Sequence, residues 1–127
     1  MTIESLKFIA DRLQDAGINY EFAEWTSDPV PDSYWVGEYT EEEPMNEDGL
    51  QQSTMLLTGT SAGSWLGLEN DKAKIENCFS KICGKTAILP SGSGIAVFYA
   101  TALVVPTGDA TLKRLQVNLT VKEWSVN

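Results

Sequence analysis

The chain lacks the residue type that most often serves in acid–base catalysis and in zinc binding, because its 127 residues include no histidine. Without an imidazole, the chain has no Ser–His or Cys–His nucleophile pair, and it lacks the histidine ligands of most zinc sites. On a helix, Cys78 and Cys83 would point about 140° away from each other around the axis. We therefore expect two free structural thiols, and neither a disulfide nor a thiolate metal site.

Two glycine-containing segments could bind an anion, and each has a simpler explanation. Residues 84–86 (Gly-Lys-Thr) match the end of a phosphate-binding loop, but Phe79 stands where that motif needs its first glycine. The segment also follows a predicted helix, where the motif requires a strand. Residues 59–65 precede a predicted helix whose N-terminus could hold an anion. They equally suit a flexible connection with capping hydroxyls, which is the interpretation we adopt.

The densest group of possible ligands is an acidic loop. Its carboxylates are Glu41, Glu42, Glu43, Glu47 and Asp48. If Gly49 is aligned with the glycine of a calcium-binding loop, Pro44 and Met55 take the first and last ligand positions, and neither can bind calcium. A looser divalent-ion site made of Glu41, Glu43, Glu47 and Asp48 stays open. A carboxylate pair for glycoside hydrolysis would need a fixed separation across a cleft, which adjacent loop glutamates do not ensure. The loop is otherwise a solvated charged segment, or one that lines or contacts another surface.

The four tryptophans are the other candidate functional residues. Tryptophan is enriched at protein interfaces, because it buries a large area at a small entropic cost. Trp35 stands in the middle of a predicted strand, and we assign it to the core. Trp25 and Trp124 stand near strand ends, and we predict that they belong to an interface.

The overall charge is acidic, since 18 acidic residues against 9 basic ones give a formal net charge of −9. An acidic surface is repelled by phosphate backbones, which disfavours nucleic-acid binding but lets DNA pass without sticking. No apolar run approaches the roughly eighteen residues of a membrane span. The first residues also lack the pattern of a signal peptide. We expect a protein that stays in the cytoplasm or in a particle assembled there.

The elements that must position these residues are organised around a long antiparallel hairpin, Gly94–Trp124. In its second arm, apolar and polar residues alternate, as in a strand with one face in a core. The apolar positions are Leu115, Val117, Leu119 and Val121. The first arm, 95–105, is almost continuously apolar or β-branched, which predicts a strand covered on both faces for part of its length. Residues 106–109 (Pro-Thr-Gly-Asp) form the turn.

The rest of the chain contributes two helices and further strands. We predict one helix capped by Thr2 and stopped by Gly17, and a second over 68–83 that Gly84 ends. The second helix has one stripe made of Leu68, Lys72, Ile75, Phe79 and Ile82. Strands are predicted at 20–25, 33–40 and 51–60, as a three-stranded meander, and at 85–89. The sequence thus predicts one α+β domain, 1–127, with an antiparallel sheet of about six strands, two helices packed on one face, and the order α-β-β-β-α-β-β-β.

This arrangement resembles the tail terminator proteins of long-tailed bacteriophages and prophages, over nearly the whole chain. The resemblance is carried by the opening helix, 2–17, and by the stretches INYEFAEW, YWVGEYTEEEPMNEDG, STMLLTGTS, LENDKAKIENCF and LQVNLTVKEW. It consists of a pattern of elements and includes no catalytic signature, so it transfers no catalytic residue.

The resemblance implies a structural protein of the virion, made in the bacterial cytoplasm and placed at the tail–neck junction. Such proteins form a ring, usually of six copies, that ends polymerisation of the tail tube and offers the surface to which the filled head joins. The implied partners are other copies of the chain, the tail tube protein and a head-completion or neck protein, with DNA passing through. No catalysis, cofactor, metal or membrane is implied. In such a ring the acidic loop would face the lumen or a neighbouring ring.

Other functions stay open. The chain could be another head–tail joining (neck) subunit, or a non-viral cytoplasmic binding module that uses its exposed sheet face. An enzyme, such as a metal-assisted hydrolase using the acidic loop, is the last alternative, and tight stoichiometric binding of a divalent ion would favour it.

Overall fold

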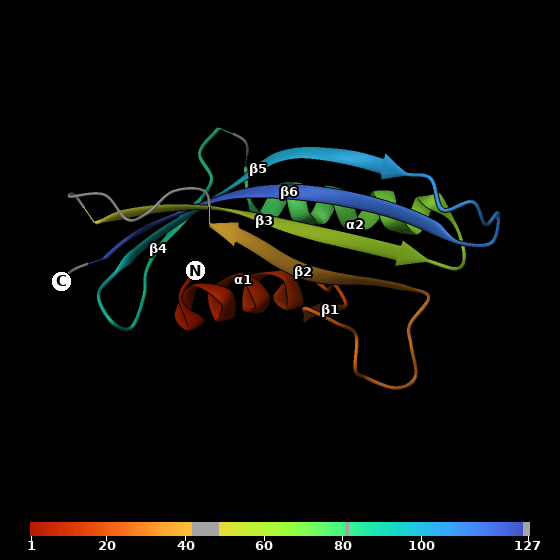
Figure 1. The fold of residues 1–127 in the computed structure, drawn as a ribbon, viewed down its shortest axis with the longest axis horizontal. Helices are drawn as coiled ribbons and strands as arrows, with labels where there is room; N and C mark the ends of the chain where they lie inside the picture. The colour runs from red at the N-terminus through yellow and green to blue at the C-terminus, as the bar shows by residue number, and fades with distance from the viewer. Residues whose placement is uncertain (42–48, 81, 126–127) are drawn as a thin grey trace.

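The computed structural model describes residues 1–41, 49–80 and 82–125. These residues form two helices and six strands, in the order helix, three strands, helix, three strands (Figure 1). The helices are α1 (Ile3–Asp15) and α2 (Trp65–Cys78). The strands are β1 (Tyr20–Phe22), β2 (Ser33–Glu41), β3 (Leu50–Ser61), β4 (Lys85–Ile88), β5 (Gly94–Val105) and β6 (Lys113–Trp124). The predicted α+β class is therefore confirmed.

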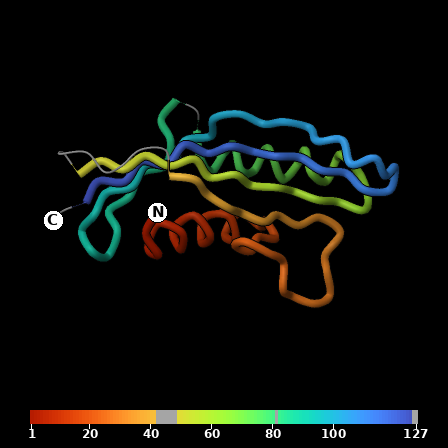
Figure 2. Tube along the Cα trace, viewed as in Figure 1, coloured from red at the N-terminus to blue at the C-terminus, as the bar shows by residue number. Residues whose placement is uncertain are grey.

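The six strands make one curled sheet in the order β1-β2-β3-β6-β5-β4. Four of its pairings are antiparallel, but β1 runs parallel to β2. The predicted meander over 20–60, and with it a wholly antiparallel sheet, is therefore wrong. The loop 23–32 projects from the sheet (Figure 2) and makes a crossover where a hairpin was expected. The carboxylate of Glu21 holds the start of this loop by accepting hydrogen bonds from the backbone N–H groups of Thr26 and Ser27, both at 3.1 Å.

Helix α1 forms as its sequence predicts. The side chain of Thr2 caps it by accepting a hydrogen bond from the backbone N–H of Ser5 at 3.2 Å. Gly17 follows the helix with a φ of +86°, a left-handed conformation that glycine adopts without strain. Ile9 and Leu13 are fully buried, so this face of α1 packs in the core, whereas Ile3 at its start is exposed.

Helix α2 begins earlier and ends earlier than the predicted span 68–83. Its last residue is Cys78, because Phe79 leaves the helical conformation with φ −129° and ψ 81°. The ring of Phe79 stays in the core, and its carbonyl accepts a hydrogen bond from the backbone N–H of Tyr99 at 2.9 Å. Beyond this point the chain turns away, so Ile82 is 89% exposed instead of completing the apolar stripe. Gly84 therefore lies in a turn and does not end the helix.

A single core lies between the helices and one face of the sheet, which confirms that both helices pack on the same face. The four alternating apolar residues of β6 all point into it, as predicted. Trp35 is fully buried there, and its indole N–H donates to the carboxylate of Asp71 on α2 at 3.0 Å. Burial of such a large side chain stabilises the fold by about 1.5–3 kcal/mol. The pairing partner of Trp35 on β3 is Gly59, whose missing side chain makes room for the indole.

Candidate functional site

The sheet face opposite the helices is not covered by any described part of the chain. Its central residues are half-exposed and mostly polar. They include Thr54, Leu56 and Thr58 on β3 and Gln116, Asn118 and Thr120 on β6. Threonine and amide side chains suit a face that meets water or a polar partner, so this open face is the first candidate binding surface of the molecule.

Charge is divided across the sheet from one edge to the other. Every charged side chain between residues 19 and 41, which contain β1 and β2, is acidic: Glu21, Glu24, Asp28, Asp32, Glu38 and Glu41. Between residues 82 and 125, which contain β4, β5 and β6, basic side chains predominate: Lys85, Lys113, Arg114 and Lys122 against Asp109 and Glu123. The sheet therefore has an acidic side at β1 and β2, while its basic side chains lie on β4 and β6, the two strands that flank the uncharged β5.

The second half of β5 is the least protected part of the sheet. Strand β4 pairs only with the beginning of β5, and a bulge at Ala100 then shifts the register with β6. We call residues 100–105 the β5 edge; residues 100–104 are all exposed, and no segment lies outside them in Figure 1. Leu103 is 60% exposed and Val104 is 52% exposed. A long, apolar and uncharged edge of this kind favours pairing with another chain.

A shallow hollow of about 310 Å³ lies where the β5 edge comes near the start of α2. Its apolar lining includes Trp65, Val104, Val105, Pro106 and Leu112. The indole of Trp65 is partly exposed, and the ammonium of Lys113 lies 5.9 Å from the centroid of its ring, within range of a cation–π contact. The hollow therefore extends the apolar surface of the β5 edge and carries a positive charge at its rim.

The opposite edge, at β1, is short and closed by local hydrogen bonds. The side-chain amide of Gln14 donates to the carbonyl of Tyr20 at 3.2 Å, and the backbone N–H of Glu24 donates to the carbonyl of Phe22 at 2.8 Å. The hydrogen bonds from the side chain and backbone of Thr26, together with those from Ser27, hold the pKa of Glu21 below its usual value of 4.5. This edge is thus largely occupied by the chain itself.

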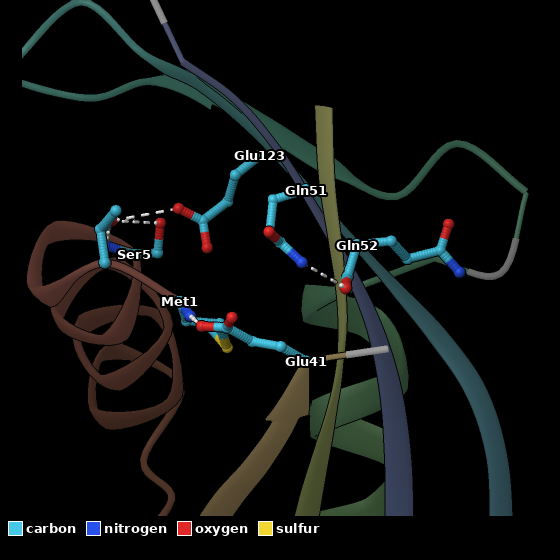
Figure 3. Close-up of polar contacts among 7 residues, drawn as sticks. Met1, Ser5, Glu41, Gln51, Gln52 and Glu123 are labelled. Atoms are coloured by element: carbon cyan, nitrogen blue, oxygen red, sulfur yellow. Dashed lines mark hydrogen bonds and ion pairs between the residues drawn. The ribbon is translucent and has the colours of Figure 1, made fainter. Parts of the chain in front are cut away.

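A polar cluster joins the N-terminus of α1 to the far end of the sheet (Figure 3). Thr2 donates from its hydroxyl to Glu123 Oε2 at 3.1 Å, while Glu123, only 6% exposed, keeps its Oε1 buried without a hydrogen-bond partner among the described atoms. The α-amino group of Met1 pairs with Glu41 at 2.7 Å. These residues surround a hollow of about 250 Å³, lined also by Gln51, Ser93 and Ser125. A carboxylate is stabilised at a helix N-terminus, so this cluster fastens α1 to β6.

The predicted site residues have different surroundings. Within the acidic loop, Glu41 ends β2, half-exposed, beside the Met1 amine. Glu42, Glu43, Glu47 and Asp48 lie outside the described residues. Trp25 is half-buried, with its ring 5.4 Å from that of Tyr34, and Trp124 is exposed at the end of β6. The structure therefore leaves the interface roles of both tryptophans as predictions, and it does not bring them together.

Two features of this surface escaped the sequence analysis. The sequence analysis expected β5 to be covered on both faces for part of its length and made no prediction about its edge, where residues 100–104 are exposed. Trp65 lines the apolar hollow, whereas the sequence analysis gave it no role. Cys78 is a half-buried free thiol at the end of α2, whereas Cys83 is free and exposed and lies beyond the helix on which both cysteines were expected.

In residues 1–41, 49–80 and 82–125, no three or more His, Cys, Asp or Glu side chains come together as possible metal ligands. No helix in the same ranges is long and apolar enough to cross a membrane.

Comparisons with known proteins found a solved structure with a similar fold, but no match in sequence. No protein-family model matches the sequence, and no curated protein matches it. Among solved structures, the chain is similar to a chain of the virion of a native gene transfer agent particle. The two share a TM-score of 0.70 with 8% sequence identity, and the match covers 92% of each chain. The protein thus shares its fold, over nearly its whole length, with a component of that particle.

Proposed function

We propose that this chain is a structural protein of a phage or phage-related particle, and that it acts as the tail terminator at the tail–neck junction. The observation that carries the proposal is the fold match with a gene transfer agent virion component, which spans 92% of both chains. One fold can host unrelated functions, so the surface of this chain has to supply the rest of the argument.

The surface supports a protein that works by assembly. An uncovered sheet face and an unprotected β5 edge offer area to other chains, and acidic and basic sides at opposite edges suit contacts between unlike surfaces of identical copies. Contacts between unlike surfaces form a closed ring when the rotations from one copy to the next add up to a full turn. A ring, proposed to have six copies, would end the tail tube and present one face to a head-completion or neck protein.

The charge of the chain suits a ring through which DNA passes. A formal net charge of −9 per copy repels phosphate backbones, so DNA would slide through the lumen without being held. In this proposal the acidic loop that begins at Glu41 faces the lumen or a neighbouring ring.

Deletion of the gene in the phage or prophage that carries it tests this function. Electron microscopy should show tails longer than normal and heads without tails, and the wild-type gene supplied in trans should restore joined particles. A copy with Glu41, Glu42, Glu43, Glu47 and Asp48 neutralised should restore tail length but eject DNA poorly, because the lumen has lost its repulsive charge.

The other outcomes separate the alternatives. Tails of normal length that fail to join heads would favour a neck subunit. Particles that stay complete and infectious after deletion would contradict a virion role. Normal DNA ejection by the neutralised variant would contradict the lumen position of the loop.

A further inference from the structure

The β5 edge and strand β1 lie at the same height on opposite sides of the sheet. The pairing register links them directly. It runs from Leu103 through Gln116, Thr58 and Val36 to Glu21, and from Ala102 through Val117, Leu57 and Gly37 to Phe22. A second copy displaced sideways, with no shift along the strands, would therefore bring its β1 level with the bare stretch of β5.

The strand directions also fit such a neighbour. Strand β1 is parallel to β2, and three successive antiparallel pairings separate β2 from β5, so β5 runs opposite to β1. If copies are related by rotation about an axis along the strands, β1 of one copy meets β5 of the next in antiparallel orientation. No strand has to be reversed or rebuilt for the two edges to come together.

Charge favours this contact over the two symmetric ones. Two β5 edges facing each other would bring Lys113 and Arg114, which lie on β6 one strand behind the edge, towards their own copies. Two β1 edges would do the same with Glu21, Glu24 and Asp28. A contact between the acidic side of one copy and the basic side of the next replaces both repulsions with attraction, and like charges facing each other oppose association.

We propose that the β5 edge of one copy docks on the β1 side of a second copy of this chain, and that this contact joins neighbouring subunits of the ring inferred above. Leu103, Val104 and the hollow beside Trp65 would receive Phe22 and Val30, which are exposed large apolar side chains of the β1 side. Because the carbonyls of Tyr20 and Phe22 already accept local hydrogen bonds, the contact relies mainly on these side chains.

Cross-linking between two different variants tests the proposed contact. In a background without the native thiols (Cys78→Ala, Cys83→Ala), Ala102→Cys and Ala23→Cys are made separately. Both positions are exposed, and Ala23 directly follows Phe22, which is level with Ala102 and is kept for the contact. They are mixed at about 1 mM, where even a contact with a millimolar dissociation constant is populated, and treated with a short bismaleimide. Ala73→Cys, at an exposed position on α2, replaces Ala102→Cys in the control mixture.

The mixture of Ala102→Cys with Ala23→Cys should give at least about ten times more cross-linked pairs than either variant alone or the control mixture, a factor equivalent to about 1.4 kcal/mol. A chain carrying both cysteines should give a ladder of covalent oligomers. Cross-linking of Ala102→Cys to itself would overturn the proposal in favour of a symmetric contact, and yields equal to the control would overturn it altogether. Neither result bears on the proposed role in the virion, which the gene deletion tests independently of this interface.

Discussion

The two edges of the sheet are built in opposite ways. At the β1 edge, the strand is short, Gln14 and Glu24 occupy its carbonyls, and Glu21 fixes a projecting loop beside it. At the β5 edge, residues 100–104 are exposed, with no charge among them and no described segment alongside. Soluble proteins usually block their sheet edges, because free edges recruit other chains. In this sheet only the β1 edge is blocked, so the open β5 edge is the one that could pair with a partner.

Of the substitutions considered, Gly37→Ala should have the largest effect on stability. Gly37 lies on β2 beside β1, where an added Cβ would collide with the hydroxyl of Tyr20 and stand 2.7 Å from the Cε of Met55, both buried. We predict that Gly37→Ala lowers the free energy of unfolding by about 1–3 kcal/mol, as overpacking of a core does. Urea unfolding followed by tryptophan fluorescence measures the change.

The matched control is Gly94→Ala, at the start of β5. There an added Cβ would stand 3.6 Å from the ring of Trp124, an ordinary contact. This variant should be unchanged or more stable by up to about 1 kcal/mol, because alanine restricts the unfolded chain. If the two variants lost stability equally, the surroundings of Gly37 beside β1 would be no more tightly packed than those of Gly94, at the end of β5 that β4 covers.

Local patterns in the sequence predicted the parts of the fold that local physics decides. Alternation along β6 gave the buried face from Leu115 to Val121, and a capping threonine with a terminal glycine gave α1. The direction of β1 escaped prediction, because it depends on hydrogen bonds from Thr26 and Ser27 to Glu21 that no periodicity encodes. The end of α2 depends on a hydrogen bond between Phe79 and Tyr99, twenty residues apart in the chain.

The candidate site was harder to predict than the fold, for the same reason. The apolar run of β5 predicts a covered strand, and at Ile95–Val97 three consecutive residues are indeed buried. Farther along, the cover depends on where β4 begins, and β4 begins at Lys85, level with Val97. Exposure of Leu103 and Val104 is therefore a tertiary property. The acidic residues and Trp25 were visible in the sequence, but their grouping on one side of the sheet required the topology.

Leu103→Glu tests whether the β5 edge serves association and not stability. Leu103 is 60% exposed, so its replacement should change the free energy of unfolding by no more than about 0.5 kcal/mol. The added negative charge should weaken self-association about tenfold or more, as measured by sedimentation equilibrium, because it would face the acidic β1 side of the neighbouring copy.

Ile82→Glu is the control for this prediction, since it places the same charge at an apolar residue that is even more exposed, at 89%, and is not part of the β5 edge. It should leave association unchanged. Equal weakening by both variants would indicate a general effect of net charge and would remove the special role of the β5 edge.

The smallest expected effect is at the acidic side, where Glu21 orders the loop 23–32. Hydrogen bonds from Thr26 and Ser27 hold its pKa below 4.5 in the folded protein. A depressed carboxyl pKa contributes stability above the unfolded value and loses it as the pH falls through the folded value. The amide proton shifts of Thr26 and Ser27 should therefore titrate together with a midpoint below 4.5, and Glu21→Gln should abolish this titration without unfolding the chain. A midpoint at or above 4.5 would mean that Glu21 does not fix the loop, and the β1 edge would then owe its closure to Gln14 and Glu24 alone.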